Sequence, residues 1–164
     1  MTARRAGIAL AVVHAVLVGT LGLKLLSDRA RLPRAWARTV PFDPDLPIRG
    51  RYVRLRLEVP LDPNDSARAG EYRRVQLRTE GDRLWGALDE AGPVGVRLDS
   101  VSGGLVAGLD EPVAFFIPEH IPDPSIRPSG EELWAEVTVP RRGPPRPIRL
   151  GVRRDGSLTP LDIQ

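Results

Sequence analysis

The stretch Tyr52-Val53-Arg54-Leu55-Arg56-Leu57-Glu58-Val59 decides the fold of this chain. Apolar residues alternate with Tyr, Arg and Glu along it, and no glycine or proline interrupts the pattern. A period of two places the apolar side chains on one face of a β-strand and the others on the opposite face. We therefore predict a strand with one buried face and one wet face.

Further short segments with strand character follow it, and turn residues separate them. They are residues 72–79, 83–88, 94–98, 112–117, 132–139, 146–153 and a last segment near Leu158. Gly81-Asp82 and Asp155-Gly156 have the composition of hairpin turns. No segment after residue 28 has a convincing helical pattern. We predict an all-β fold, a sandwich or partly open barrel of short antiparallel strands, preceded by one N-terminal transmembrane helix.

The composition favours the same all-β fold class and excludes several kinds of chemistry. The chain has 17 prolines and 16 glycines, a mix that suits short strands joined by turns. It has no cysteine, which excludes disulfides, thiolate catalysis and cysteine-ligated metals. Lys24 is the single lysine beside many arginines, and abundant Ala, Gly and Pro accompany them. This usage is typical of a bacterial genome rich in G and C.

The N-terminal segment has the length and composition of a membrane span. Residues 6–23 carry no charge, and the apolar run continues past Lys24 to Leu26. As a helix, residues 6–26 would be about 31 Å long, which matches the hydrocarbon core of a bilayer. We interpret residues 1–27 as an uncleaved signal anchor, 28–40 as a juxtamembrane linker, and 41–164 as an exported β domain.

Two other interpretations of the N-terminus are open. A cleaved signal peptide has a shorter apolar region and a cleavage site soon after it, whereas the nearest small-x-small triplet here is Ala35-Trp36-Ala37. A buried soluble helix is disfavoured by apolarity on all sides. With one span, we predict a single-pass protein of the cytoplasmic membrane. Arg4-Arg5 favour a cytoplasmic N-terminus and an exported C-terminal domain, although arginines also follow the span. In the linker, Trp36 is either an interfacial anchor or a simple linker residue.

A strip of small residues follows one side of the predicted span. Small side chains let another helix approach closely, and His14 lies near the edge of the strip, where it can hydrogen-bond across an interface. The strip can also arise by chance in a segment rich in Ala and Gly. The interface residues we predict are Gly7, Ala11, His14, Ala15 and Gly19, and the partner would be a polytopic membrane protein.

The charge distribution argues against nucleic acid as a partner. The formal net charge is +3, from 24 basic and 21 acidic residues. All the acidic residues lie from Asp28 onward, whereas Arg4, Arg5 and Lys24 precede them, so the remaining 21 basic and 21 acidic residues cancel. The basic excess therefore belongs to the anchor, and residues 28–164 are formally neutral.

The first strand and its approach resemble the signature of the GDYXXLXY-domain family. Asp43-Pro44-Asp45-Leu46 precedes residues 49–57, in which Gly50, Tyr52 and Leu55 match the named motif. Arg51 and Leu57 stand where that family has Asp and its final Tyr. Further on, Phe115-Phe116-Ile117-Pro118-Glu119 is similar to the family's "FFxPE" element, and residues 132–161 are similar to its closing strands. The likeness covers roughly residues 40–162.

The resemblance implies a bacterial membrane-anchored protein of a family without a known function, often associated with a polytopic membrane protein. The family-motif residues carried over are Gly50, Tyr52, Leu55, Phe116, Pro118 and Glu119. The loss of Asp and Tyr puts any activity that rests on those side chains in doubt. A structural reading of the motif is also available, in which Gly50 supplies a turn, Tyr52 lies on the outer face and Leu55 belongs to the core.

Catalytic signals in the sequence are weak. A signal-peptidase-like mechanism needs a serine shortly before the "GDxV"-like strand and a lysine base in the domain, but residues 28–50 contain no serine and Lys24 lies in the anchor. His120 is the one histidine outside the span, and Glu119 and Asp123 beside it do not complete a metal site. We predict no enzyme, no metal and no cofactor.

The function we predict is therefore that of a membrane-anchored accessory or interaction protein of the cell envelope. The alternative is a module that binds an anionic polymer or headgroup through Arg54, Arg56 and Arg149, if these residues share one face. A hydrolase of unrecognised type is a third possibility, and a deep polar pocket around His120 would favour it.

Overall fold

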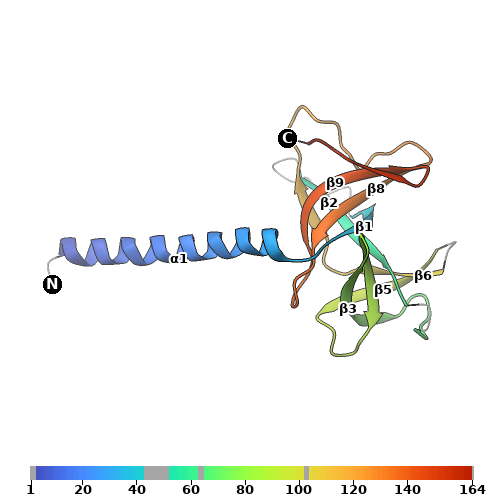
Figure 1. Cartoon of the computed structure of the whole chain (residues 1–164), viewed down its shortest axis with the longest axis horizontal. Helices are drawn as coiled ribbons and strands as arrows, with labels where there is room; N and C mark the ends of the chain where they lie inside the picture. The colour runs from blue at the N-terminus through green and yellow to red at the C-terminus, as the bar shows by residue number, and fades with distance from the viewer. Residues whose placement is uncertain (1–2, 43–51, 63–64, 102–103, 164) are drawn as a thin grey trace. The chain divides into compact units, whose positions relative to one another are not determined.

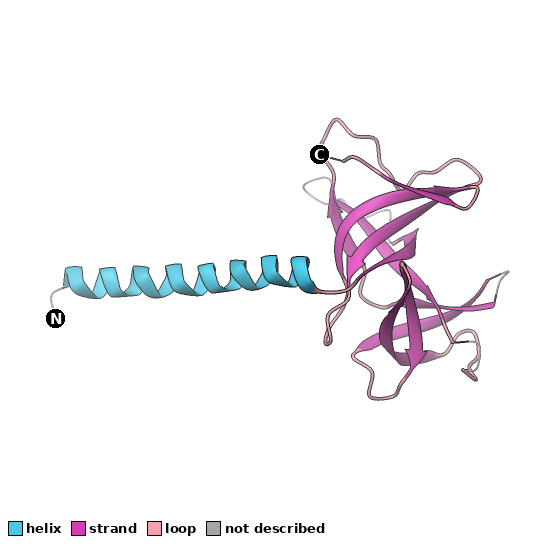
Figure 2. Ribbon diagram, in the orientation of Figure 1, coloured by secondary structure: helices cyan, strands magenta, loops and turns pink. Residues whose placement is uncertain are grey.

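The computed structural model describes residues 3–42, 52–62, 65–101 and 104–163. The chain divides into two compact units, residues 1–32 and 33–164. Figure 2 shows a helix in the first unit and strands joined by loops in the second. The all-β fold predicted after one N-terminal helix is confirmed, and strands make up 49% of the structure.

The first unit is the helix α1 (Ala3–Arg31). Its segment Arg5–Arg31 is long and apolar enough to cross a membrane, a property that spans and signal sequences share. The large apolar side chains from Ile8 to Leu26 are exposed. Two polar side chains bond back to the helix: the His14 ring nitrogen Nδ1 lies 3.0 Å from the Leu10 carbonyl oxygen, and the Thr20 hydroxyl donates to the Val16 carbonyl at 2.6 Å.

The second unit is a ten-stranded sheet in the order β10-β9-β8-β1-β4-β3-β5-β6-β2-β7. Nearly all neighbouring strands are antiparallel, and β1 with β4 is the parallel pair. The strands are β1 (Arg34–Pro41), β2 (Tyr52–Pro60), β3 (Tyr72–Glu80), β4 (Arg83–Leu88), β5 (Val94–Val101), β6 (Gly104–Leu109), β7 (Val113–Phe116), β8 (Glu131–Thr138), β9 (Arg146–Arg154) and β10 (Ser157–Pro160).

The strand β1 closes the sheet into a barrel because it pairs with three others. Its second half pairs with β2, from Arg38↔Glu58 to Pro41↔Leu55, which joins the two sides of a six-stranded barrel formed by β1, β4, β3, β5, β6 and β2. Its first half pairs with β8, which carries β9 and β10 outward. In Figure 1, β1 lies between β8 and β9 on one side and β3 and β5 on the other.

The core consists of the alternating apolar residues of these strands. The predicted buried face of β2 is confirmed, since Leu55, Leu57 and Val59 are fully buried. Val75, Val96, Leu98 and Leu109 are also fully buried and belong to the same cluster. Burying a Val or Leu side chain stabilises a fold by about 1.5–3 kcal/mol, so this alternation is the main source of stability for the domain.

The predicted linker 28–40 is wrong over most of its length. Residues up to Arg31 continue α1, and residues 34–41 form β1. Trp36, expected in a linker or at a lipid interface, is buried in the β domain. The sequence gives little sign of this strand because Ala35 and Ala37, small residues of weak strand propensity, face the core. β6 is a second strand that the sequence pattern does not predict, because its glycines resemble a turn.

Candidate functional site

Two tryptophans lie on the face of β1, β8 and β9 that is turned away from the core. The register places Trp36 opposite Glu136 and Trp134 opposite Arg38. Trp134 is also opposite Gly151 of β9, and a Cβ added at that glycine would lie 2.9 Å from the Trp36 ring. Glycine therefore makes room for the Trp36 indole, and both tryptophans are less than a tenth exposed.

A cleft of about 220 Å³ lies between these tryptophans and the neighbouring strands. β1, β2, β4, β8 and β9 each contribute one charged side chain to it, and these side chains are Arg38, Glu58, Arg83, Glu132 and Arg153. Pro60, Leu84 and Val106 supply apolar surface. The cleft therefore combines charged groups with two indoles and an apolar wall, a mixture typical of ligand sites.

Arg38 holds the two carboxylates of the cleft. Its Nη1 donates to Glu58 Oε2 at 3.3 Å, and its Nε lies 3.2 Å from Glu132 Oε1. The other carboxylate oxygen of Glu132 accepts from the Trp134 indole nitrogen at 3.1 Å. Both carboxylates are therefore engaged by side chains of the protein.

Burial raises the pKa of the Glu58 carboxyl group above its ordinary value. The nearby carboxylates of Asp99 and Glu132 act in the same direction, whereas the guanidinium groups of Arg38 and Arg56 oppose it. The net direction is upward because the Glu58 side chain is only 13% exposed and loses most of its hydration.

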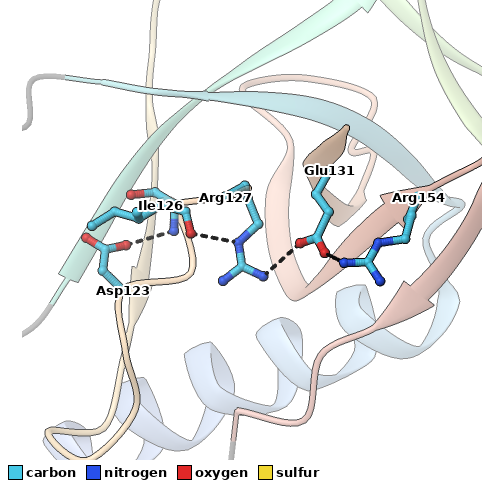
Figure 3. A network of polar contacts seen from close by, with 6 residues as sticks. Asp123, Ile126, Arg127, Glu131 and Arg154 are labelled. Carbon is cyan, nitrogen blue, oxygen red and sulfur yellow. Dashed lines mark hydrogen bonds and ion pairs between the residues drawn. The ribbon is translucent and has the colours of Figure 1, made fainter. Parts of the chain in front are cut away.

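A second hollow shares Arg38, Glu132 and Arg153 with the cleft. Glu131 on its wall accepts from Arg127 at 3.5 Å and forms an ion pair with Arg154 (Figure 3). In the same network, Arg127 Nε donates to the carbonyl of the preceding residue, Ile126. Glu131 is therefore held by two arginines, neither of which is Arg153.

The motif residues carried over from the resemblance fall into different environments. Tyr52 and Phe116 are cross-strand partners on β2 and β7, with ring centroids 5.6 Å apart in an edge-to-face arrangement, and both are exposed. Leu55 lies in the core. Pro118 is half-buried and Glu119 exposed, whereas Gly50 lies outside the described residues.

The three arginines predicted to bind anions do not form one cluster. The guanidinium carbons of Arg54 and Arg56 lie 5.2 and 4.8 Å from the centroid of the Phe42 ring. Arg149 lies on β9, whereas Arg54 and Arg56 lie on β2, and β8 and β1 separate those two strands. Its Nε donates to Glu136 at 2.6 Å, and its guanidinium carbon lies 5.5 Å from the centroid of the Trp36 ring.

The remaining predicted residues lie in exposed positions. Gly7, Ala11, His14, Ala15 and Gly19 are exposed along α1. His120 is exposed in a turn after β7, where the Ile121 amide donates to the Pro118 carbonyl at 3.1 Å. It does not line the cleft.

Sequence reasoning missed the cleft residues Trp36, Arg38, Glu132, Trp134 and Arg153. One signal was present in Glu132-Leu133-Trp134-Ala135-Glu136, where the apolar alternation puts Trp134 on the supposedly wet face. A tryptophan between two glutamates on that face indicates that other side chains cover it. The partners that do so come from β1, β4 and β9, and only the fold brings them together.

The fold defines the class of protein: an N-terminal apolar helix is followed by a β domain with a closed six-stranded barrel and added strands. No family model, curated protein or solved structure matches the chain. The resemblance to the GDYXXLXY-domain family stays a prediction that rests on the residues named above.

Proposed function

We propose that this chain is a membrane-anchored, non-enzymatic accessory protein of the bacterial cell envelope, with its β domain on the exported side. The observation that carries the proposal is α1, whose apolar side chains are exposed from Ile8 to Leu26. An apolar surface of that length needs lipid or another protein around it.

The partner we propose is a polytopic membrane protein that packs against the small-residue strip. A Cβ added at Gly7 or at Gly19 would meet nothing within 4 Å, so this side of the helix is open. One ring nitrogen of His14 is already bonded to the Leu10 carbonyl, which leaves the other for a hydrogen bond across a helix pair.

The cleft supports a binding role over a catalytic one. The side chains that line it include no hydroxyl, thiol or imidazole, and its carboxylates are bonded to Arg38. A nucleophile activated by a neighbouring base, the usual arrangement in hydrolases, therefore has no counterpart among these side chains.

Crosslinking and pull-down of the full-length protein from membranes tests the partner. The variant Gly7→Leu/Ala11→Leu/Ala15→Leu/Gly19→Leu fills the strip, and we expect it to lose the polytopic partner. The control Ala9→Leu/Val13→Leu/Val16→Leu enlarges the opposite side of the helix and should keep it. Identical partners from both variants would refute docking through the strip.

The absence of cysteine allows a direct test of orientation. Ser66 and Ser157 are exposed in the β domain, so Ser66→Cys or Ser157→Cys should leave the fold intact. We expect a membrane-impermeant maleimide to label either variant in intact spheroplasts. Labelling only after lysis would place the domain in the cytoplasm.

A further inference from the structure

Two arginines of the cleft stack on the same indole. The guanidinium carbon of Arg83 lies 5.5 Å from the centroid of the Trp134 ring, and that of Arg153 lies 5.1 Å from it. They reach the ring from separate strands, β4 and β9. Stacking uses the flat face of a guanidinium group and leaves its in-plane N–H donors available.

Carboxylates around the cleft are bonded to other groups, and Glu80, the cross-strand partner of Arg83, pairs with Arg78. Glu132 faces Arg153 across the strand pair, yet it bonds Arg38 and the Trp134 indole nitrogen. Glu131 is held by Arg127 and Arg154. Asp155 lines the second hollow but not the cleft. Among the residues that the structure describes, Arg83 and Arg153 thus have N–H donors without a carboxylate within ion-pair distance.

We propose that this cleft binds a small ligand through an oxyanion, a carboxylate or a phosphate group, held between Arg83 and Arg153. A guanidinium fork matches the paired oxygens of such a group, and the neighbouring indole excludes water and strengthens the bonds. The apolar wall of Pro60, Leu84 and Val106 would receive the uncharged part of the ligand. A sugar stacked on Trp134 fits less well, because guanidinium groups already lie against that ring.

The size of the cleft restricts the ligand. A volume of about 220 Å³ lies below the range of about 300–1,000 Å³ usual for sites that bury drug-sized molecules. The ligand is therefore a compact anion such as a short phosphate ester or an aromatic acid. The binding site that we infer is separate from Arg54, Arg56 and Arg149, and it does not depend on the proposed membrane partner.

NMR of the indole N–H groups tests the proposal with full-length protein in maltoside micelles. The chain has three tryptophans, so three indole signals are expected, and Trp→Phe variants assign them. The probes are inorganic phosphate and sodium benzoate, each added at constant ionic strength. We expect a saturable shift of the Trp134 signal with at least one probe. Saturation by phosphate alone indicates a phosphate ester as the ligand, and saturation by benzoate alone indicates a carboxylate.

Substitutions assign the binding to the two arginines. Arg83→Gln and Arg153→Gln should each weaken binding about tenfold or more, since each removes a charge-assisted contact. Arg73→Gln is the matched control, because Arg73 is exposed and paired with Glu71, and its affinity should stay within about twofold. Arg83 is exposed, so its variant should fold even if Arg153→Gln does not. Equal affinity in wild type and Arg83→Gln, or no saturable shift with either probe, overturns the proposal.

Discussion

Replacing Arg38 by methionine should destabilise the β domain by about 2 kcal/mol at pH 7. The change leaves the Glu58 carboxylate, 13% exposed, without its counter-ion, and a buried polar group left unpaired costs about 1–3 kcal/mol. The second pair, with Glu132, contributes less because both side chains are about 40% exposed. Methionine keeps the apolar length of the arginine side chain, so most of the loss comes from the charge.

Urea unfolding of the full-length protein in micelles, followed by tryptophan fluorescence, measures this cost. The loss should shrink as the pH falls from 7 towards 4.5, because a protonated Glu58 needs no counter-ion. In a Glu58→Gln background the same substitution should cost less than about 1 kcal/mol. Arg73→Met, at an exposed pair with Glu71, should cost less than about 0.5 kcal/mol. A loss at Arg38 that equals this control, or that does not change with pH, would refute the reasoning.

Three further predictions concern pH dependence and packing. The pKa of Glu58 is raised in the folded protein, so this group lowers stability as the pH rises from about 4.5 through its folded pKa. Glu58→Gln should remove that decline, and urea midpoints between pH 4 and pH 7 measure it. If the midpoint of the variant falls relative to that of wild type as the pH rises over this range, the pKa of Glu58 is not raised. Gly92→Ala should destabilise by about 1–3 kcal/mol, because the added Cβ would lie 2.5 Å from the Val75 backbone. Gly86→Ala, whose nearest contacts are side chains at 3.3 Å, should cost clearly less, and equal urea midpoints for the two variants would count against this view. Leu55→Ala in the core should cost about 2–5 kcal/mol in the same assay, and a cost below 1 kcal/mol would show that the motif leucine is not a core residue.

The strands that can be predicted from the sequence are those in which large apolar residues alternate clearly with polar ones. The β2 pattern is visible because large apolar residues face the core and arginines face outward. In β1 the sizes are reversed: Ala35 and Ala37 are buried in the core, and the larger Trp36 lies on the other face. β6 contains Gly108, where a Cβ would lie 3.1 Å from the Arg56 side chain, and glycine at this position gives the strand a sequence that resembles a turn.

Closure of the barrel could not be predicted from periodicity. A two-residue repeat states which side of a strand is buried but not which strands are neighbours. β1 and β2 pair as consecutive strands of the chain, whereas β1 and β8 pair although they are far apart in the sequence. The cleft depends on both pairings, because Glu58 comes from β2 and Glu132 from β8, and Arg38 bridges them. No residue of the cleft therefore stands out in the sequence, and the cleft is recognisable only once the fold has brought its residues together.

The position of β1 has a consequence for how the domain is made. β1 precedes the other strands of this sheet in the chain, yet Arg34 pairs with Thr138, roughly a hundred residues later. The sheet therefore cannot be completed until β8, β9 and β10 have also left the ribosome. Until then, β1 has an unpaired edge that can join a strand of another molecule. A β domain dominated by such distant pairings is expected to fold in milliseconds to seconds, slowly enough for a chaperone to bind it first.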